Sequence, residues 1–104
     1  MRSSLENEVR IIEKKINDLD RSESMTNDEL HVHIASIITH LYRAIQSTVN
    51  FQETSLINPT VERLDSLILT IKRVKLEHFW QTVKGTFESK RKDFHAQVLE
   101  IYRV

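Results

Sequence analysis

The stretch VKGTFESKRKDF, Val83 to Phe94, contains the only glycine of this 104-residue chain. A glycine inside a helix costs about 1 kcal/mol relative to alanine, which is small beside the burial of several large side chains. Val83 and Phe87 lie four residues apart on either side of Gly85, and the apolar period keeps its phase beyond them. Neither a polar loop nor a proline follows the glycine. We therefore predict that a helix runs through Gly85, continuous or kinked, and the alternative is a helix that stops there.

The sequence around this stretch divides into three helical segments. Apolar residues recur at steps of three and four near the start of the chain, the spacing of a coiled-coil seam. Thr26 and Glu29 then have the spacing of a capping box, which starts a second helix. Asn58 is a good N-cap and Pro59 suits the first position of a helix, so we place the start of a third helix there. The expected helices span about 4–20, 27–53 and 59–103.

The third expected helix determines the predicted fold. About 45 residues make a rod of roughly 65 Å, whereas a compact chain of this length has a radius of gyration of about 13 Å. The apolar period drifts near Val74 and Leu76, which we interpret as a coiled-coil stutter inside one helix. We therefore predict an all-α, coiled-coil-like single domain over 1–104, an elongated antiparallel helical hairpin with a short, a long and a very long helix. The alternative is a four-helix bundle broken at Gly85.

A hairpin of this kind would expose apolar residues beside its main stripe. Two helices bury only a narrow stripe each, so wider apolar faces indicate self-association or binding of other coiled-coil proteins. Trp80 is the preferred anchor of such an interface, because buried tryptophans dominate the energy of many interfaces. The expected interface residues are Tyr42, Leu69, Leu76, Phe79, Trp80, Val83, Phe87, Phe94 and Tyr102.

Composition excludes several classes of protein. Fifteen basic and fifteen acidic side chains cancel, so no global charge attracts the chain to nucleic acid or to an anionic membrane. The chain has no cysteine, which excludes disulfides and thiol chemistry and fits a reducing, intracellular and cytoplasmic setting. No run of about eighteen apolar residues is present, so we expect no membrane insertion.

The sequence also lacks a pattern for catalysis or for a bound cofactor. The five histidines do not form a metal-binding set, since His31 and His33 point about 200° apart on a helix. The carboxylates fall on polar helix faces, and no glycine-rich phosphate loop or nucleophile motif occurs. We therefore expect no enzyme activity, no metal and no cofactor.

One segment is strongly basic. Residues 72–92 contain seven bases and two acids, a local charge of +5, whereas the first 29 residues are acidic. Pairing between the basic distal arm and the acidic first helix, within or between chains, is a common use of such asymmetry. The bases are scattered over half of the helix circumference, and a stacking platform for nucleic-acid bases is missing. The residues expected to make electrostatic contacts are Lys84, Lys90, Arg91 and Lys92.

Three short motifs resemble the helical segment of a central-channel nucleoporin of the phenylalanine–glycine repeat type. They are MTNDEL, HLYRAI and TFESKRKDF, and the matching residues are Thr26, Asp28, Leu30, Tyr42, Phe87, Glu88, Ser89, Lys90 and Arg91. The resemblance implies a scaffold segment excised from a longer protein of the nuclear pore complex. In that family, coiled-coil hairpins associate with each other and anchor repeats that gate nucleocytoplasmic transport. This chain departs from the family in its longer SLINPT connection and in having no phenylalanine–glycine repeat.

The sequence thus predicts a non-enzymatic structural and oligomerisation module, in the nucleus if the resemblance holds. Two alternatives remain open at this point. One is a helical module that binds nucleic acid through its basic distal arm, and the other is a compact regulatory four-helix bundle.

Overall fold

The computed structural model describes residues 4–71 and 73–103, apart from the side chain of residue 22. Within these residues the chain forms four α-helices and one 3₁₀-helix and contains no strand. The all-α prediction is therefore confirmed. The elements are α1 (Ser4–Asn17), the 3₁₀-helix η1 (Asp18–Ser24), α2 (Asn27–Ser47), α3 (Phe51–Thr70) and α4 (Glu77–Ile101).

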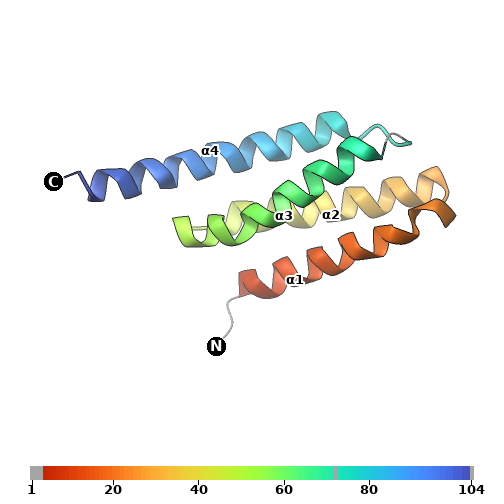
Figure 1. Cartoon of the computed structure of the whole chain (residues 1–104), viewed down its shortest axis with the longest axis horizontal. Helices are drawn as coiled ribbons and strands as arrows, with labels where there is room; N and C mark the ends of the chain where they lie inside the picture. Colours follow the sequence, from red (N-terminus) through yellow and green to blue (C-terminus); the bar gives the residue numbers. More distant parts are fainter. Residues whose placement is uncertain (1–3, 72, 104) are drawn as a thin grey trace.

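Successive helices run in opposite directions (Figure 1). The α1–α2 and α3–α4 connections lie at one end of the molecule, and the α2–α3 connection lies at the other. Helix α1 packs against α2 and α3, and α4 packs on the other side against the same two helices. The radius of gyration is 15.1 Å and the principal extents are 56 × 32 × 17 Å. A compact chain of this length has a radius of gyration of about 13 Å. The molecule is therefore elongated, as predicted, but only somewhat.

The first half of the chain follows the sequence pattern closely. The buried residues of α1 and η1 are those of the predicted seam, and the helix tightens into 3₁₀ geometry from Asp18 onward. Thr26 caps α2 as expected, since its hydroxyl accepts a hydrogen bond from the Glu29 amide at 3.1 Å. The seam residues are Leu5, Val9, Ile12, Ile16 and Leu19.

The second predicted boundary is wrong. Helix α2 ends at Ser47 and α3 begins at Phe51, so one expected helix over 27–53 does not exist. Asn50 provides the N-cap by accepting a hydrogen bond from the Glu53 amide at 2.9 Å, and the Glu53 carboxylate accepts one from the Val49 amide. The pair resembles a capping box, except that the Glu53 carboxylate binds the amide of the residue before the N-cap.

Asn58 is consequently not an N-cap, and Pro59 lies exposed inside α3. A proline in a helix interior removes one backbone donor and strains the preceding turn. The helix tolerates this cost because its inner face is continuous on both sides of Pro59. The buried residues of that face are Thr54, Ile57, Thr60, Val61, Leu64 and Ile68.

The expected helix over 59–103 is also wrong, because the chain turns between α3 and α4. The apolar drift that looked like a stutter is this turn: Leu76 is buried, and Ile71 and Val74 pack on the core. Arg73 holds the turn to the start of α2 by donating hydrogen bonds to the Asn27 side chain at 3.0 Å and to the Met25 backbone carbonyl at 2.6 Å.

The prediction for Gly85 is confirmed, because it lies inside the continuous helix α4. The alternative with four helices had the correct helix number but the wrong break point. Folding back at 71–76 allows one chain to bury faces that a two-arm hairpin would expose. The expectation that Leu76 and Trp80 lie on an exposed flank is therefore wrong, since Trp80 is only 1% exposed.

Candidate interaction surfaces

The apolar face of α4 continues beyond the bundle. Trp80, Val83 and Phe87 are buried on this face. Seven residues after Phe87 it continues as Phe94 and then, at steps of four and three, as Val98 and Ile101; Phe94 and Val98 are half-buried and Ile101 is 72% exposed. The C-terminal end of α4 extends past the neighbouring helices in Figure 1. An amphipathic face thus runs on after its partners end.

Other apolar side chains lie at the same end of the molecule. Tyr102 is 81% exposed beside this face of α4, and Val49, in the loop between α2 and α3, is 73% exposed. Large exposed apolar side chains gathered at one end of a domain are typical of a contact surface. We name as the distal surface the residues Val49, Phe94, Val98, Ile101 and Tyr102.

A lysine of α4 binds the C-terminal end of α2 next to the distal surface. The Lys90 ammonium donates hydrogen bonds to the Ile45 carbonyl at 2.9 Å and to the Gln46 carbonyl at 2.8 Å. These carbonyls belong to the last turn of α2, which has no basic residue of its own. A cation at the C-terminal end of a helix satisfies free carbonyls and complements the helix dipole. Lys90 therefore caps a neighbouring helix.

A second polar cluster joins α3 to α4 in the middle of the bundle. The indole N–H of Trp80 donates a hydrogen bond to Asp65 Oδ1 at 2.8 Å, and the Lys84 ammonium lies 3.2 Å from Asp65 Oδ2. The hydrogen bond from Trp80 lowers the pKa of Asp65 below its ordinary value of about 3.8; the contacts with Lys84 act in the same direction, and burial opposes them. Asp65 thus stays ionised where two helices meet.

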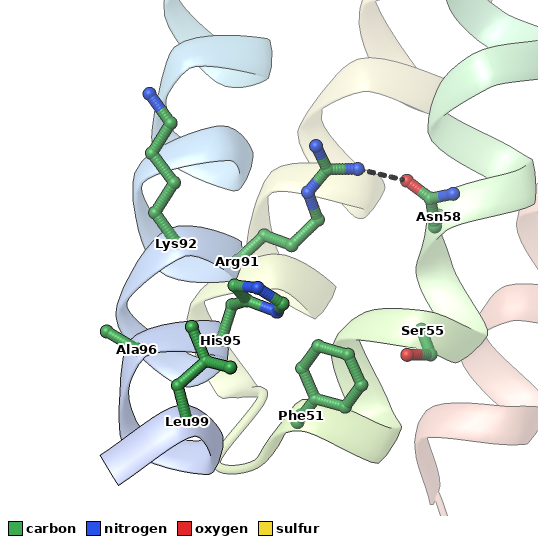
Figure 2. A pocket seen from close by; sticks show the side chains of 8 residues that line it. All are labelled: Phe51, Ser55, Asn58, Arg91, Lys92, His95, Ala96 and Leu99. Carbon is green, nitrogen blue, oxygen red and sulfur yellow. Dashed lines mark hydrogen bonds between the residues drawn. The ribbon is translucent and has the colours of Figure 1, made fainter. Parts of the chain in front are cut away.

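A groove of about 520 Å³ lies between the N-terminal half of α3 and the C-terminal half of α4 (Figure 2). Arg91 reaches across it and donates a hydrogen bond to Asn58 Oδ1 at 3.2 Å. The rings of Phe51 and His95 are tilted by 41° to each other, with centroids 6.2 Å apart. The residues that line the groove are Phe51, Ser55, Asn58, Arg91, Lys92, His95, Ala96 and Leu99.

The structure separates the residues that the sequence had grouped as an interface. Leu76, Trp80, Val83 and Phe87 lie in the core of the single chain, and Tyr42 is partly buried against it. Leu69 and Phe79 are 61% and 39% exposed, away from the distal surface. Phe94 and Tyr102 are the two that belong to the distal surface.

The four predicted electrostatic residues also separate. Lys84 pairs with Asp65 and Lys90 caps α2, so both act inside the chain. Arg91 and Lys92 line the groove. Lys90 also borders a polar hollow around Gly85 and Ser89. The predicted basic stripe is therefore used partly for internal contacts.

The histidines make local contacts. His33 Nε2 lies 3.0 Å from the Lys15 carbonyl oxygen, and His40 Nδ1 lies 3.1 Å from Glu8 Oε1. Among residues 4–71 and 73–103, no group of three histidine or carboxylate side chains is placed to hold a metal ion. None of the described helices is long and apolar enough to cross a membrane.

Sequence reasoning missed the groove and the Asp65 cluster. The helical period places Asp65 on a polar, solvated helix face, and the sequence predicts Asn58 as a helix cap. Each depends on a partner more than ten positions away on another helix, such as Trp80 for Asp65 and Arg91 for Asn58. The helix period alone carries no signal for such pairs.

Comparison of the chain with protein-family models, with curated proteins and with solved structures finds no match. The resemblance to a channel nucleoporin therefore stays a prediction. The long continuous arm that the resemblance implied is replaced by two antiparallel helices, α3 and α4.

Proposed function

We propose that this protein is a non-enzymatic structural module that self-associates through its distal surface. The observation that carries the proposal is the continuation of the buried face of α4 toward its C-terminal end, first as the half-buried Phe94 and Val98 and then as the exposed Ile101. Exposed apolar residues at helical spacing bind a matching helix face, and the interaction gains roughly 25 cal/mol for each Å² of apolar surface removed from water.

A second copy of the chain is the occupant that we propose. Each copy offers the same helix end, and a twofold axis makes one surface complementary to itself. The formal net charge is zero at neutral pH, so two copies do not repel each other at long range. Antiparallel pairing of the two α4 ends, with the twofold axis near Val98, leaves the two bundles on opposite sides of the contact.

The absence of cysteine allows a direct test of this geometry. In the variant Val98→Cys the only thiols of a dimer lie close to the twofold axis, so mild oxidation is expected to give a disulfide-linked dimer within minutes. The matched control is Lys75→Cys, which places an exposed thiol in the turn at the other end of the bundle. The readout is the fraction of dimer on a non-reducing gel.

Sedimentation velocity supplies the second readout. The unmodified chain is expected to sediment as a dimer at about 100 μM, and Ile101→Asp, which puts a charge on the distal surface, is expected to sediment as a monomer. The control Val32→Asp changes an equally exposed side chain of α2. A monomer for the unmodified chain at 100 μM, with equal cross-linking of the two cysteine variants, would refute the proposal.

The nuclear-pore role remains a narrower proposal on the same basis. It needs a partner hairpin in addition to the second copy, and its test is co-sedimentation with coiled-coil segments of channel nucleoporins. Binding that survives Ile101→Asp would show that the distal surface does not serve this role. Nucleic-acid binding through the basic arm has less support, because Lys84 and Lys90 are engaged within the chain.

A further inference from the structure

The groove between α3 and α4 combines an apolar floor with cationic side chains. Phe51, Ala96 and Leu99 supply the apolar part, and Arg91, Lys92 and His95 supply the polar part. No aspartate or glutamate is among the described residues that line it. This composition is complementary to a ligand that has an apolar body and a negative charge.

Arg91 is held in position over the groove. Its guanidinium donates to Asn58 Oδ1 at 3.2 Å, and the Asn58 amide nitrogen in turn donates to Glu62 Oε1 at 3.5 Å, which orients the amide oxygen toward Arg91. Arg91 also lies 6.0 Å from the centroid of the Phe87 ring. The hydrogen bond to Asn58 uses one of five N–H donors, and a guanidinium binds carboxylates in a bidentate manner.

The aromatic pair forms the other end of the groove. Figure 2 shows the His95 ring below Arg91 and the Phe51 ring below His95, with Leu99 next to His95 and Lys92 extending away from them. One guanidinium fork therefore faces an apolar wall. This arrangement suits a monoanion with an extended hydrocarbon body better than a small, fully hydrated dianion, whose charge would need more donors.

We propose that this groove is a binding site for small amphipathic carboxylates, with the carboxylate on Arg91 and the hydrocarbon body along Phe51, His95 and Leu99. The volume of about 520 Å³ lies within the range of roughly 300 to 1,000 Å³ that ligand sites occupy. None of the eight lining residues belongs to the distal surface, so this proposal does not depend on self-association.

The experiment is a titration of the ¹⁵N-labelled chain, followed by amide chemical shifts, with octanoate as the probe. A ligand of this size is expected to bind with a dissociation constant of roughly 1 mM. The shifts are expected to saturate and to cluster at the amides of Ser55, Asn58, His95 and Leu99. Octan-1-ol tests the apolar contribution alone, and inorganic phosphate tests the charge alone.

Two variants separate the role of Arg91 from the shape of the groove. Arg91→Gln removes the charge and is expected to weaken octanoate binding about tenfold while leaving octan-1-ol binding unchanged. Leu99→Ala removes part of the apolar wall beside His95 and is expected to weaken both ligands. The control Lys75→Gln removes an exposed charge from the turn between α3 and α4 and is expected to change neither.

Three outcomes would overturn the proposal. The first is equal binding of octanoate and octan-1-ol, which would indicate a nonspecific apolar surface. The second is equal binding of octanoate and phosphate, which would indicate an adventitious ion site. The third is an Arg91→Gln variant that has the same melting temperature as the unmodified chain and binds octanoate with the same affinity. Repeating the titration on Ile101→Asp separates the result from self-association, since octanoate affinity is expected to stay the same.

Discussion

Removal of the Asp65 carboxylate is the sharpest test of the bundle that the structure describes. Asp65 accepts the only side-chain hydrogen bond that Trp80 can donate, at 2.8 Å, and Trp80 is 1% exposed. In Asp65→Ala this indole N–H loses its partner in a buried position. A lost hydrogen bond to a charged acceptor, together with an unsatisfied buried donor, costs about 2 to 3 kcal/mol.

The substitution Asp65→Asn separates the hydrogen bond from the charge. The amide oxygen of asparagine still accepts the hydrogen bond from Trp80, so only the ion pair with Lys84 is lost. Because that pair is partly exposed to solvent, the expected loss is about 0.5 to 1 kcal/mol. We therefore expect the free energy of unfolding to fall much more for alanine than for asparagine.

Urea unfolding measures both variants, and Trp80 is a built-in fluorescent probe because it is the only tryptophan of the chain. A double-mutant cycle with Trp80→Phe, followed by circular dichroism, isolates the contact. If the unsatisfied N–H is the cause, Asp65→Ala costs about 1 to 2 kcal/mol less in the Trp80→Phe background. A loss below about 0.5 kcal/mol for Asp65→Ala, or no coupling in the cycle, would refute the reasoning.

The pH dependence follows from the same contact. The pKa of Asp65 is lowered in the folded state, mainly by the Trp80 hydrogen bond. The stabilisation is therefore fully present above the ordinary aspartate pKa of about 3.8, and it is lost as the pH falls through the folded-state value. The stability difference between the unmodified chain and Asp65→Asn is expected to be constant near pH 7 and to shrink below pH 4.

Two further predictions concern α4. Gly85→Ala is expected to stabilise the bundle by about 1 kcal/mol, because Gly85 lies mid-helix and an added Cβ meets no atom within 4 Å beyond its chain neighbours and the nearby backbone of α4; destabilisation in urea unfolding would contradict this. Lys90→Met is expected to cost about 1 kcal/mol by freeing the carbonyls of Ile45 and Gln46, and to increase amide hydrogen exchange in the last turn of α2. The exposed Lys92 provides the matched control, so an equal loss in Lys92→Met would remove the capping explanation.

Helix type and the inner face of the first helix could be predicted from local pattern. The seam from Leu5 to Leu19, the cap at Thr26 and the continuity of α4 through Gly85 all follow from spacing within one or two helical turns. The boundaries at 48–50 and 71–76 could not be assigned this way. In the first case Asn58 and Pro59 predicted a helix start, but α3 begins after the Asn50 cap and its buried face continues past Pro59.

The candidate sites were less predictable than the helices. The aromatic residues of α4 were read as one interface, but the structure buries Trp80 and Phe87 and exposes Tyr102. Trp80, Phe87, Phe94 and Tyr102 follow one another at steps of seven or eight positions, so their spacing does not separate the buried from the exposed ones. What differs is the presence of neighbouring helices, which end before α4 does (Figure 1).

The sequence by itself determined that this chain is helical, that the seam from Leu5 to Leu19 faces inward, and that Gly85 does not end a helix. These properties depend on residues three or four positions apart, whose relative placement the helical backbone sets. The tertiary structure alone decided that α4 folds back on α3, that Asp65 binds Trp80, and that Arg91 spans a groove to Asn58. These contacts join residues 15 and 33 positions apart, and only the packing of complete helices selects them from the many pairings that the same pattern allows.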